Sequence, residues 1–345
     1  MKALVKVQHG DGFIELKEVP RPHIGPDDVL INVKAVGICG FDITLYHETP
    51  AYSKFLNPPV ILGHEFSGVI VEVGKNVKDF TEGDRVTCET HAVTCGRCYY
   101  CMSGKYNLCP ERLGLGYQKD GAFAEFVKVP VIRLHKLPNN ISFEEGALSE
   151  PCSVCYHALV DIAHIKPGES VVIIGPGPIG LLSLQIAKIQ GARIILVSGT
   201  ELDKERLSLA NKLGAEVTVN ISEEDPVKKV MEITNGFGCD IVIETSGAAL
   251  ARMQAIDMVR KGGKIVLIGH GAGKAEVNLD PLVYKEVAML GSWSHVWEDW
   301  ENVLKLMATN YINVKPLINK FPLNEWKKAF EAVEMKKVVK AILIP

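Results

Sequence analysis

The chain has 345 residues, about two domains' worth, with 47% hydrophobic and 23% charged residues. These values are ordinary for a folded globular protein and exclude disorder, collagen-like repeats and a small disulfide-stapled scaffold. The formal charge of −3, without a run of Lys or Arg, gives no indication of binding to nucleic acid or an anionic membrane.

The first 130 residues are predicted to form a β-rich domain. Short strands are expected at 29–35, 67–73 and 84–88, each bounded by a turn that contains glycine. The start of the chain lacks the apolar core of a signal peptide, so we expect a cytoplasmic protein without a membrane segment.

From about residue 156 the pattern changes to alternating strands and helices, which is typical of parallel βαβ units. We expect strands at 171–174, 193–197, 241–244, 264–268 and 287–290, and helices at 179–190 and 203–213. The last fifty residues are predicted to hold helices at 297–308 and 324–335 and a closing strand at 341–344. This order fits a doubly wound domain inserted between two segments of a β-rich domain.

Four of the nine cysteines lie within fifteen residues, at Cys95, Cys98, Cys101 and Cys109. Four thiolates with short spacers can wrap one zinc ion as a tetrahedron, and such a closed site is structural. An iron–sulfur cluster is the chemical alternative. The sequence therefore predicts a structural metal lobe at 88–110.

A glycine loop follows the predicted strand 171–174 and opens a helix, as G-x-G-x-x-G. Gly175 allows a tight turn, Gly177 lets the backbone approach a pyrophosphate, and Gly180 lets the helix pack closely on the strand. Pro178 and Ile179 complete the loop. The order strand, loop, helix and second strand predicts a dinucleotide site.

The second strand ends in Ser198, Gly199 and Thr200, where an NAD-selective site usually carries an acidic residue. A small residue at this place relieves repulsion of a 2′-phosphate, which Ser198 and Thr200 could bind and Lys204 or Arg206 could neutralise. We therefore favour NADP over NAD. The alternative is that Glu201 or Asp203 turns inward and serves NAD.

Two further segments carry a possible catalytic metal site, Gly37-Ile38-Cys39-Gly40-Phe41-Asp42 and Gly63-His64-Glu65-Phe66-Ser67-Gly68. The pattern G-H-E-x2-G-x5-G-x2-V, the four cysteines and the glycine loop occur in one order along the chain. Together they resemble the zinc-dependent medium-chain dehydrogenase/reductase family. Within this family the chain is more similar to the sorbitol and threonine dehydrogenase branch. It has Glu150, within Leu148-Ser149-Glu150-Pro151, where classical alcohol dehydrogenases have a cysteine.

The resemblance implies an α/β protein in which a GroES-like β-barrel catalytic domain is split by an inserted Rossmann domain. The barrel would comprise 1–155 and 296–345, and the doubly wound parallel-sheet domain 156–295. Two zinc ions per chain are implied. Cys39, His64 and a carboxylate, Glu65 or Glu150, would hold the catalytic zinc, and the four clustered cysteines the structural zinc. Ser246, Ile268 and Gly269 would line the cofactor site.

The implied reaction is hydride transfer between a nicotinamide cofactor and a secondary alcohol or polyol, or its ketone, at a zinc with an open position. Relatives usually carry Ser or Thr where this chain has Phe41, and often a histidine where it has Thr44, so the usual hydroxyl relay is broken. His47, His295 or the zinc-bound water beside Glu150 are the candidate proton routes, because imidazole titrates near neutral pH.

The alternative to an enzyme is a zinc-stabilised cofactor-binding protein with weak or lost dehydrogenase activity. The intact set of Cys39, His64 and Glu65 argues against it. By analogy with the family we expect a homodimer or homotetramer that acts on a small molecule and binds neither nucleic acid nor a membrane.

Overall fold

The computed structural model describes residues 1–49, 53–271, 274 and 276–345, and the chain in it forms two compact units. The first unit comprises Met1–Glu150, Val296–Asn310 and Val314–Pro345, and the second comprises Pro151–His295 and Tyr311–Asn313. Helix α4 (Ser149–Tyr156) carries the chain from the first unit into the second. Among the described residues, no helix is long and apolar enough to cross a membrane.

The first unit is built on a seven-stranded sheet with the order β10-β6-β5-β3-β18-β17, in which β9 also pairs with β3. A smaller sheet has the order β2-β1-β4, and β7 pairs with β8. The strands are β1 (Lys2–Lys6), β2 (Ile14–Glu18), β3 (Asp28–Gly37), β4 (Val60–Ile61), β5 (Glu65–Val73), β6 (Arg85–Cys88), β7 (His91–Val93), β8 (Leu113–Gly114), β9 (Phe126–Pro130), β10 (Leu134–Lys136), β17 (Ile318–Pro322) and β18 (Lys340–Ile344).

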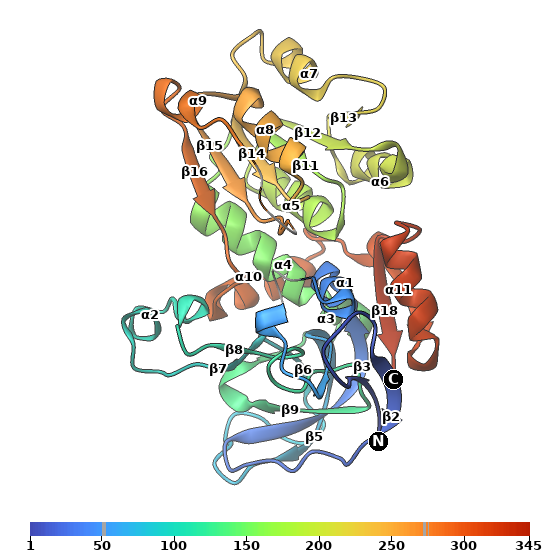
Figure 1. Ribbon diagram of the computed structural model, residues 1–345. Coiled ribbons are helices and arrows are strands. Elements are labelled where there is room, and N and C mark those ends of the chain that lie inside the picture. The colour runs from blue at the N-terminus through green and yellow to red at the C-terminus, as the bar shows by residue number, and fades with distance from the viewer. Residues whose placement is uncertain (50–52, 272–273, 275) are drawn as a thin grey trace. The chain divides into compact units, whose positions relative to one another are not determined.

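The two ends of the chain meet in this sheet, because β18 pairs antiparallel with β3 through Ile342 opposite Gly37. Figure 1 shows the last strand, red, beside the early strand β3, blue. The buried apolar side chains of β3, β5, β9 and β18 form one core with helix α11 (Trp326–Glu334). The first unit is therefore complete only when the C-terminal segment is in place.

Helices are few in the first unit, as the sequence predicts, but several short helices were not predicted, and two of them have clear N-terminal caps. These are α1 (Gly40–His47), capped by Cys39, and α3 (Phe143–Ala147), which begins at a capping box of Ser142 and Glu145. Their apolar residues lack the long helical period that marks a helix in sequence, because each is only two turns or less. The other helices of this unit are α2 (Tyr99–Met102) and α10 (Trp297–Ala308).

The second unit is a six-stranded sheet with the order β13-β12-β11-β14-β15-β16, in which all pairs are parallel. The strand order is that of a dinucleotide-binding Rossmann sheet, so the predicted doubly wound fold is confirmed. The strands are β11 (Ser170–Ile174), β12 (Ile194–Gly199), β13 (Val217–Asn220), β14 (Cys239–Glu244), β15 (Val259–Leu267) and β16 (Ala288–Gly291).

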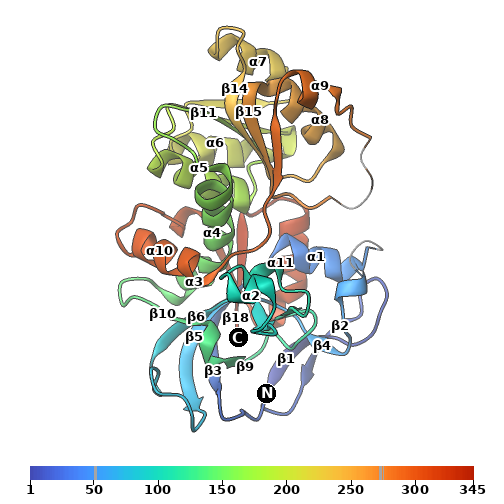
Figure 2. The same ribbon diagram turned by 90° about the vertical axis from the view of Figure 1, so that its left-hand side faces the viewer.

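Helices cover both faces of this sheet (Figure 2), with α5 and α6 on one face and α7 and α8 on the other. They are α5 (Pro178–Ile189), α6 (Lys204–Leu213), α7 (Pro226–Ile233), α8 (Ala249–Met258) and α9 (Asp280–Tyr284). Local signals set several helix ends: Asp225 accepts the N–H groups of Val227 and Lys228 before α7, and α6 ends at Gly214 with φ 110°. The carboxyl ends of β11, β12, β14 and β15 therefore share one edge, where a dinucleotide binds in such sheets.

Candidate metal and cofactor sites

The four clustered cysteines converge, since their sulfur atoms all lie within 4.8 Å of one another. Cys95 Sγ lies 3.9 Å from Cys101 Sγ and 3.6 Å from Cys109 Sγ. Sulfur ligands about 2.3 Å from a zinc at the centre of a tetrahedron lie at close to these separations. All nine cysteines of the chain are free thiols. This cluster therefore fits one zinc ion with four thiolate ligands.

The backbone of the cysteine lobe favours the thiolate form of Cys95, whereas burial raises the pKa of Cys101 to about 12. The N–H of Cys98 donates to Cys95 Sγ at 3.3 Å, and the N–H of Cys95 donates to Cys109 Sγ at 3.4 Å. Backbone donors at Arg97 and Cys98 lower the pKa of Cys95 to about 6, so this sulfur is largely ionised at neutral pH. Thiolate is the form that binds zinc.

A second convergence in the first unit joins Cys39, His64 and Glu65, whose ligand atoms lie within 4.8 Å of one another. Cys39 is the N-cap residue of α1, and His64 directly precedes β5, where Gly63 turns the chain with φ 89°. His64 is 5% exposed and Glu65 1% exposed. Burial and the neighbouring Glu65 raise the pKa of the Cys39 thiol.

Asp42 supports this trio, and the sequence analysis assigned it no role. One carboxylate oxygen accepts the N–H of Cys39 at 2.9 Å, and the other lies 3.6 Å from His64 Nδ1. Burial raises the pKa of Asp42 to about 6, against the opposing effect of His64. Within the described part of the chain, Asp42 Oδ1 and His64 Nδ1 are buried atoms without a hydrogen bond. A histidine that binds a metal through one nitrogen and faces a carboxylate with the other has this arrangement.

Lys340 is the second residue that the sequence analysis missed. Its ammonium, on β18, forms a close ion pair with Glu65 Oε2, and both side chains are at most 2% exposed. Gly37 leaves the necessary space, because a Cβ there would collide with Glu65 Oε2. Burial lowers the pKa of Lys340, but Glu65, Cys39 and Glu150 outweigh burial and raise it overall. A lysine at the start of an otherwise apolar closing strand was the only sequence signal.

Glu150 lies near this group without joining the trio. It is 7% exposed, at the start of α4, and its charge raises the pKa values of Cys39 and Lys340. The nearby Cys152 and Cys155 are buried, and the Cys155 thiol donates to the carbonyl of Ile179 at 3.3 Å. Their burial indicates that both are packing residues.

The glycine loop in the second unit has the geometry that a pyrophosphate needs. Gly175 has φ 105°, and Gly177 caps α5, whose first residue is Pro178. A Cβ on Gly177 would meet nothing within 4 Å, so its backbone is open to a ligand. A Cβ on Gly180 would lie 1.9 Å from the carbonyl oxygen of Gly175. Ile179 follows Pro178 in the first turn of the helix.

At the end of β12, Asp203 occupies the space beside Gly199. A Cβ on Gly199 would lie 3.1 Å from Asp203 Cβ. The Asp203 carboxylate accepts hydrogen bonds from Thr200 N at 3.1 Å and from Thr200 Oγ1 at 2.7 Å. It also forms an ion pair with Arg206 at 3.4 Å. Ser198 is 1% exposed, and among the described residues its hydroxyl has no hydrogen bond. Thr200 and Arg206 are thus engaged with one buried carboxylate.

The other residues expected at this edge lie at the ends of β14 and β15. Glu244 accepts hydrogen bonds from Ser246 N at 2.7 Å, Ser246 Oγ at 2.6 Å and Gly247 N at 2.8 Å. Ile268 and Gly269 follow β15, and a Cβ on Gly269 would lie 2.3 Å from Gly247 N. These contacts fold the loops after β14 and β15 tightly against each other.

The two candidate proton-accepting histidines have different surroundings. His47 Nδ1 lies 2.8 Å from Asp11 Oδ1, and Nε2 lies 2.6 Å from Glu334 Oε1, so both ring nitrogens are engaged. These carboxylates, Glu334 first, raise the pKa of His47. His295 is fully buried and belongs to the second unit, whereas Cys39, His64, Glu65 and Glu150 belong to the first.

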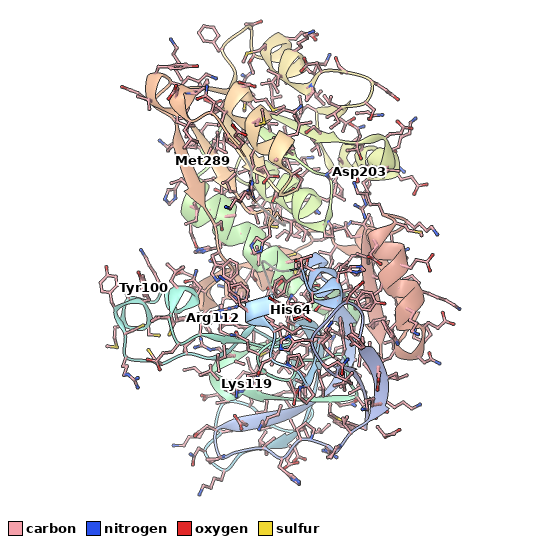
Figure 3. The ribbon with its side chains drawn as sticks, in the orientation of Figure 1. His64, Tyr100, Arg112, Lys119, Asp203 and Met289 are labelled. Atoms are coloured by element: carbon pink, nitrogen blue, oxygen red, sulfur yellow. The ribbon has the colours of Figure 1, made fainter. Side chains whose placement is uncertain are left out.

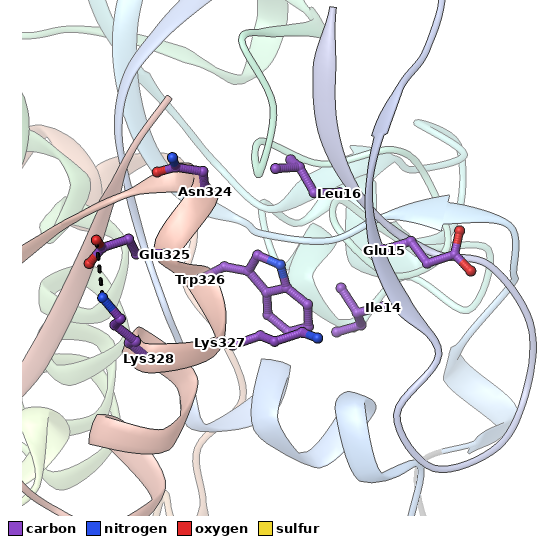
Figure 4. Close-up of a pocket in the computed structure, with 8 residues that line it drawn as sticks. All are labelled: Ile14, Glu15, Leu16, Asn324, Glu325, Trp326, Lys327 and Lys328. Carbon is purple, nitrogen blue, oxygen red and sulfur yellow. Dashed lines mark ion pairs between the residues drawn. The ribbon is translucent and has the colours of Figure 1, made fainter.

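Figure 3 labels His64 in the first unit and Asp203 in the second, and in this view Arg112 lies between His64 and Tyr100 of the cysteine lobe. A surface pocket of about 700 Å³ lies elsewhere in the first unit, between β2 and the start of α11 (Figure 4). Trp326 forms its floor, and Glu325 and Lys328 pair across 3.2 Å at its rim. None of the residues predicted to bind metal or cofactor lines it.

Comparison with known proteins identifies the family. Residues 25–139 match the family described as "Alcohol dehydrogenase GroES-like domain", and residues 178–309 match "Zinc-binding dehydrogenase". The chain is 41% identical to a sorbitol dehydrogenase of Halalkalibacterium halodurans, over 100% of this chain and 99% of that protein. It is 40% identical to a D-arabitol-phosphate dehydrogenase of Enterococcus avium, over 99% and 97%.

Solved structures give the same result. A zinc-binding dehydrogenase from Sinorhizobium meliloti, described as bound to NADP, matches with a TM-score of 0.90 and 34% identity, over 100% of this chain and 99% of that one. A 2R,3R-butanediol dehydrogenase from Bacillus subtilis matches with a TM-score of 0.89 and 33% identity, over the same shares. These relatives are named for dehydrogenase activities, which favours an enzyme over the alternative of a cofactor-binding protein. The chain therefore belongs to the zinc-dependent medium-chain dehydrogenase/reductase family, in its polyol branch, and is an oxidoreductase that acts on a CH–OH group with zinc and a nicotinamide cofactor.

Proposed function

We propose that the chain oxidises a secondary hydroxyl of a polyol, or reduces the corresponding ketone, at a zinc held by Cys39, His64 and Glu65. The convergence of these three side chains carries the proposal. When bound, zinc supplies Lewis acidity to the alcohol oxygen, and the nicotinamide supplies the hydride acceptor or donor. The GroES-like segments would act as the catalytic domain, and the Rossmann segment as the cofactor domain.

Each protein side chain has a distinct part in this site. Asp42 orients the imidazole of His64 through Nδ1, and Lys340 compensates the buried charge of Glu65. We choose Glu65 over Glu150 as the carboxylate ligand, because only Glu65 lies within 4.8 Å of the other two ligand atoms. Glu65→Gln is expected to abolish zinc binding at this site. Glu150→Gln is expected to retain the zinc and to lower kcat, and metal analysis of both variants tests the choice.

We propose that the proton leaves by way of Glu150 and not His47. Glu150 is close enough to Cys39 and Lys340 to alter their pKa values, whereas two carboxylates hold both nitrogens of His47. His295 remains the alternative. An unchanged pH–rate profile in His295→Asn would remove His295 from the reaction.

We propose NADP as the preferred cofactor. Gly199 carries no carboxylate, and the carboxylate of the adjacent Asp203 is held by Thr200 and Arg206. The relative from Sinorhizobium meliloti is described as bound to NADP. The ratio of kcat/KM for NADP to that for NAD tests the proposal, and a ratio below one would contradict it.

A substrate panel tests the activity itself. Polyols, polyol phosphates, amino alcohols and simple secondary alcohols are each incubated with NAD and with NADP, and cofactor reduction is followed by absorbance. We expect reduction with at least one polyol. Reduction with none of them would overturn the proposed activity. We further propose a cytoplasmic homodimer or homotetramer, which light scattering of the purified protein tests.

A further inference from the structure

Three aromatic rings meet beside the catalytic ligands of the first unit. The ring of Phe41 lies 6.3 Å from that of His64 and 5.2 Å from that of Tyr117, centre to centre. Tyr117 and His64 are also 6.3 Å apart, and all three pairs are close to perpendicular. The phenol ring of Tyr117 thus lies next to the imidazole of the proposed ligand His64. The apolar ring of Phe41, in the first turn of α1, lies beside both.

The phenol of Tyr117 is held in one position. Its hydroxyl accepts a hydrogen bond from Arg112 Nη1 at 2.8 Å, and the ring lies over Gly114, where a Cβ would be 1.8 Å from Tyr117 Cζ. The backbone carbonyl of Tyr117 accepts the N–H of Asn57 at 2.9 Å. Tyr117 is only 6% exposed. The side chain therefore has no freedom to turn away without displacing its neighbours.

Arg112 is fixed as well. Its Nε donates to His91 Nδ1 at 2.6 Å, and its Nη2 lies 3.4 Å from Thr90 Oγ1. A guanidinium is a donor only, so the hydroxyl of Tyr117 is always the acceptor in their hydrogen bond. A phenol has a single hydrogen, and Arg112 thereby leaves that hydrogen to be donated to another group.

We propose that Tyr117 is a specificity-determining residue that donates its hydroxyl hydrogen to a second hydroxyl of the substrate, one carbon from the reacting carbon. Arg112 is the positioning residue that acts through Tyr117. The substrate class that benefits is a vicinal diol within a polyol chain, with its carbon backbone against Phe41. A monohydric secondary alcohol gains nothing from Tyr117. The inference rests on the proposed function, because it assumes that the reacting oxygen binds at the metal held by His64.

The test compares 2,3-butanediol with 2-butanol, which share a four-carbon chain and differ in the second hydroxyl. We expect Tyr117→Phe in the zinc-loaded enzyme to raise KM and Kd for the diol about tenfold, the worth of one hydrogen bond, with little effect on kcat. The values for 2-butanol are expected to stay unchanged. Tyr100→Phe, on the cysteine lobe, is the matched control and is expected to change neither.

Arg112→Met is expected to reproduce part of this loss of preference for the diol. The double variant Arg112→Met/Tyr117→Phe is expected to lose little more of the preference than Tyr117→Phe alone, because both residues act through the same hydroxyl. Arg112→Lys is expected to recover part of the preference for the diol. Melting temperature and zinc content separate these effects from misfolding. Equal losses for both probes in Tyr117→Phe, or an unchanged preference for the diol, would overturn the inference.

Calorimetric Kd values distinguish failure of the inference about Tyr117 from failure of the proposed function. If the wild-type enzyme turns over neither probe, the activity proposal loses support, while the binding preference for the diol still reports on Tyr117. If the diol binds to the wild-type enzyme no better than 2-butanol, the inference about Tyr117 is wrong even where polyols are oxidised.

Discussion

At the scale of single residues, the buried ion pair of Lys340 and Glu65 links the closing strand to the proposed metal site. Both charges are at most 2% exposed, so neither is solvated when its partner is removed. Breaking such a pair costs about 3–5 kcal/mol, because one charge stays buried without compensation. The closing strand thus contributes to the proposed metal site through Lys340, which pairs with the carboxylate of Glu65.

Lys340→Met is therefore expected to lower the free energy of unfolding by about 3 kcal/mol and to weaken zinc binding at the Cys39 site. Denaturant unfolding and metal analysis of the purified variant measure the two effects. Lys337→Met is the control, because Lys337 is 63% exposed and its pair with Glu331 spans 4.0 Å. A change of less than 0.5 kcal/mol, on the order of a surface substitution, is expected there. Equal stabilities of the two variants would contradict this account.

His47 gives a prediction for pH. Its pKa is raised by Glu334 and Asp11, so protonation is favoured in the folded chain relative to the unfolded one. The stabilisation is complete below the unfolded pKa, about 6.5, and is lost as pH rises through the higher folded pKa. We expect His47→Gln to lower the melting temperature near pH 6 and to have a smaller effect near pH 9. An effect that grows with pH would show that the sign is wrong.

At the scale of secondary structure, the glycines around the loop between β11 and α5 have two different functions, close packing and access for the cofactor. Gly180 is required by packing, since its Cβ would lie 1.9 Å from the Gly175 oxygen, whereas Gly177 faces open space. We expect Gly180→Ala to lower the melting temperature. Gly177→Ala is expected to keep the melting temperature and to weaken cofactor binding at least about tenfold, because a methyl group stands where the pyrophosphate approaches. Cofactor fluorescence titration distinguishes them, and the reverse pattern would refute the assignment.

Helices with a long stretch of helical hydrophobic periodicity, and strands with a continuous apolar run, were predictable from the sequence. The strands that became β11, β12 and β14 and the helices that became α5, α6 and α10 were all expected close to their observed positions. Helices α1 and α7 were not, because each has only eight residues, too few for a helical period to stand out in the sequence. Cys39 and His64, with Glu65 or Glu150 as the carboxylate, were expected from the resemblance to the family's motifs, which left the choice between the two carboxylates open. Asp42 and Lys340 were not, because their roles arise from contacts that tertiary packing makes, and Lys340 lies 275 positions from Glu65 in the chain numbering.

At the scale of the whole molecule, the two proposed metal sites imply different consequences of metal loss. Four thiolates would form a closed ligand set, whereas Cys39, His64 and Glu65 would leave a fourth place open on the zinc. We expect about two zinc ions per chain by elemental analysis. Cys98→Ser is expected to remove one ion and to lower the melting temperature. Cys39→Ser is expected to remove the other and to abolish activity with a smaller change in melting temperature. A single ion per wild-type chain would contradict the assignment of two sites.

The pairing of β18 with β3 has a consequence for biosynthesis. Residues 318–344 emerge from the ribosome more than 250 residues after Cys39, His64 and Glu65. The Rossmann segment is nearly continuous in sequence and has its whole sheet available earlier. Glu65 receives its lysine only after the Rossmann segment has been synthesised, so this carboxylate has no Lys340 partner in shorter nascent chains. Premature termination a few residues before Lys340 would therefore leave a cofactor domain able to fold beside a barrel that lacks its metal-site cation.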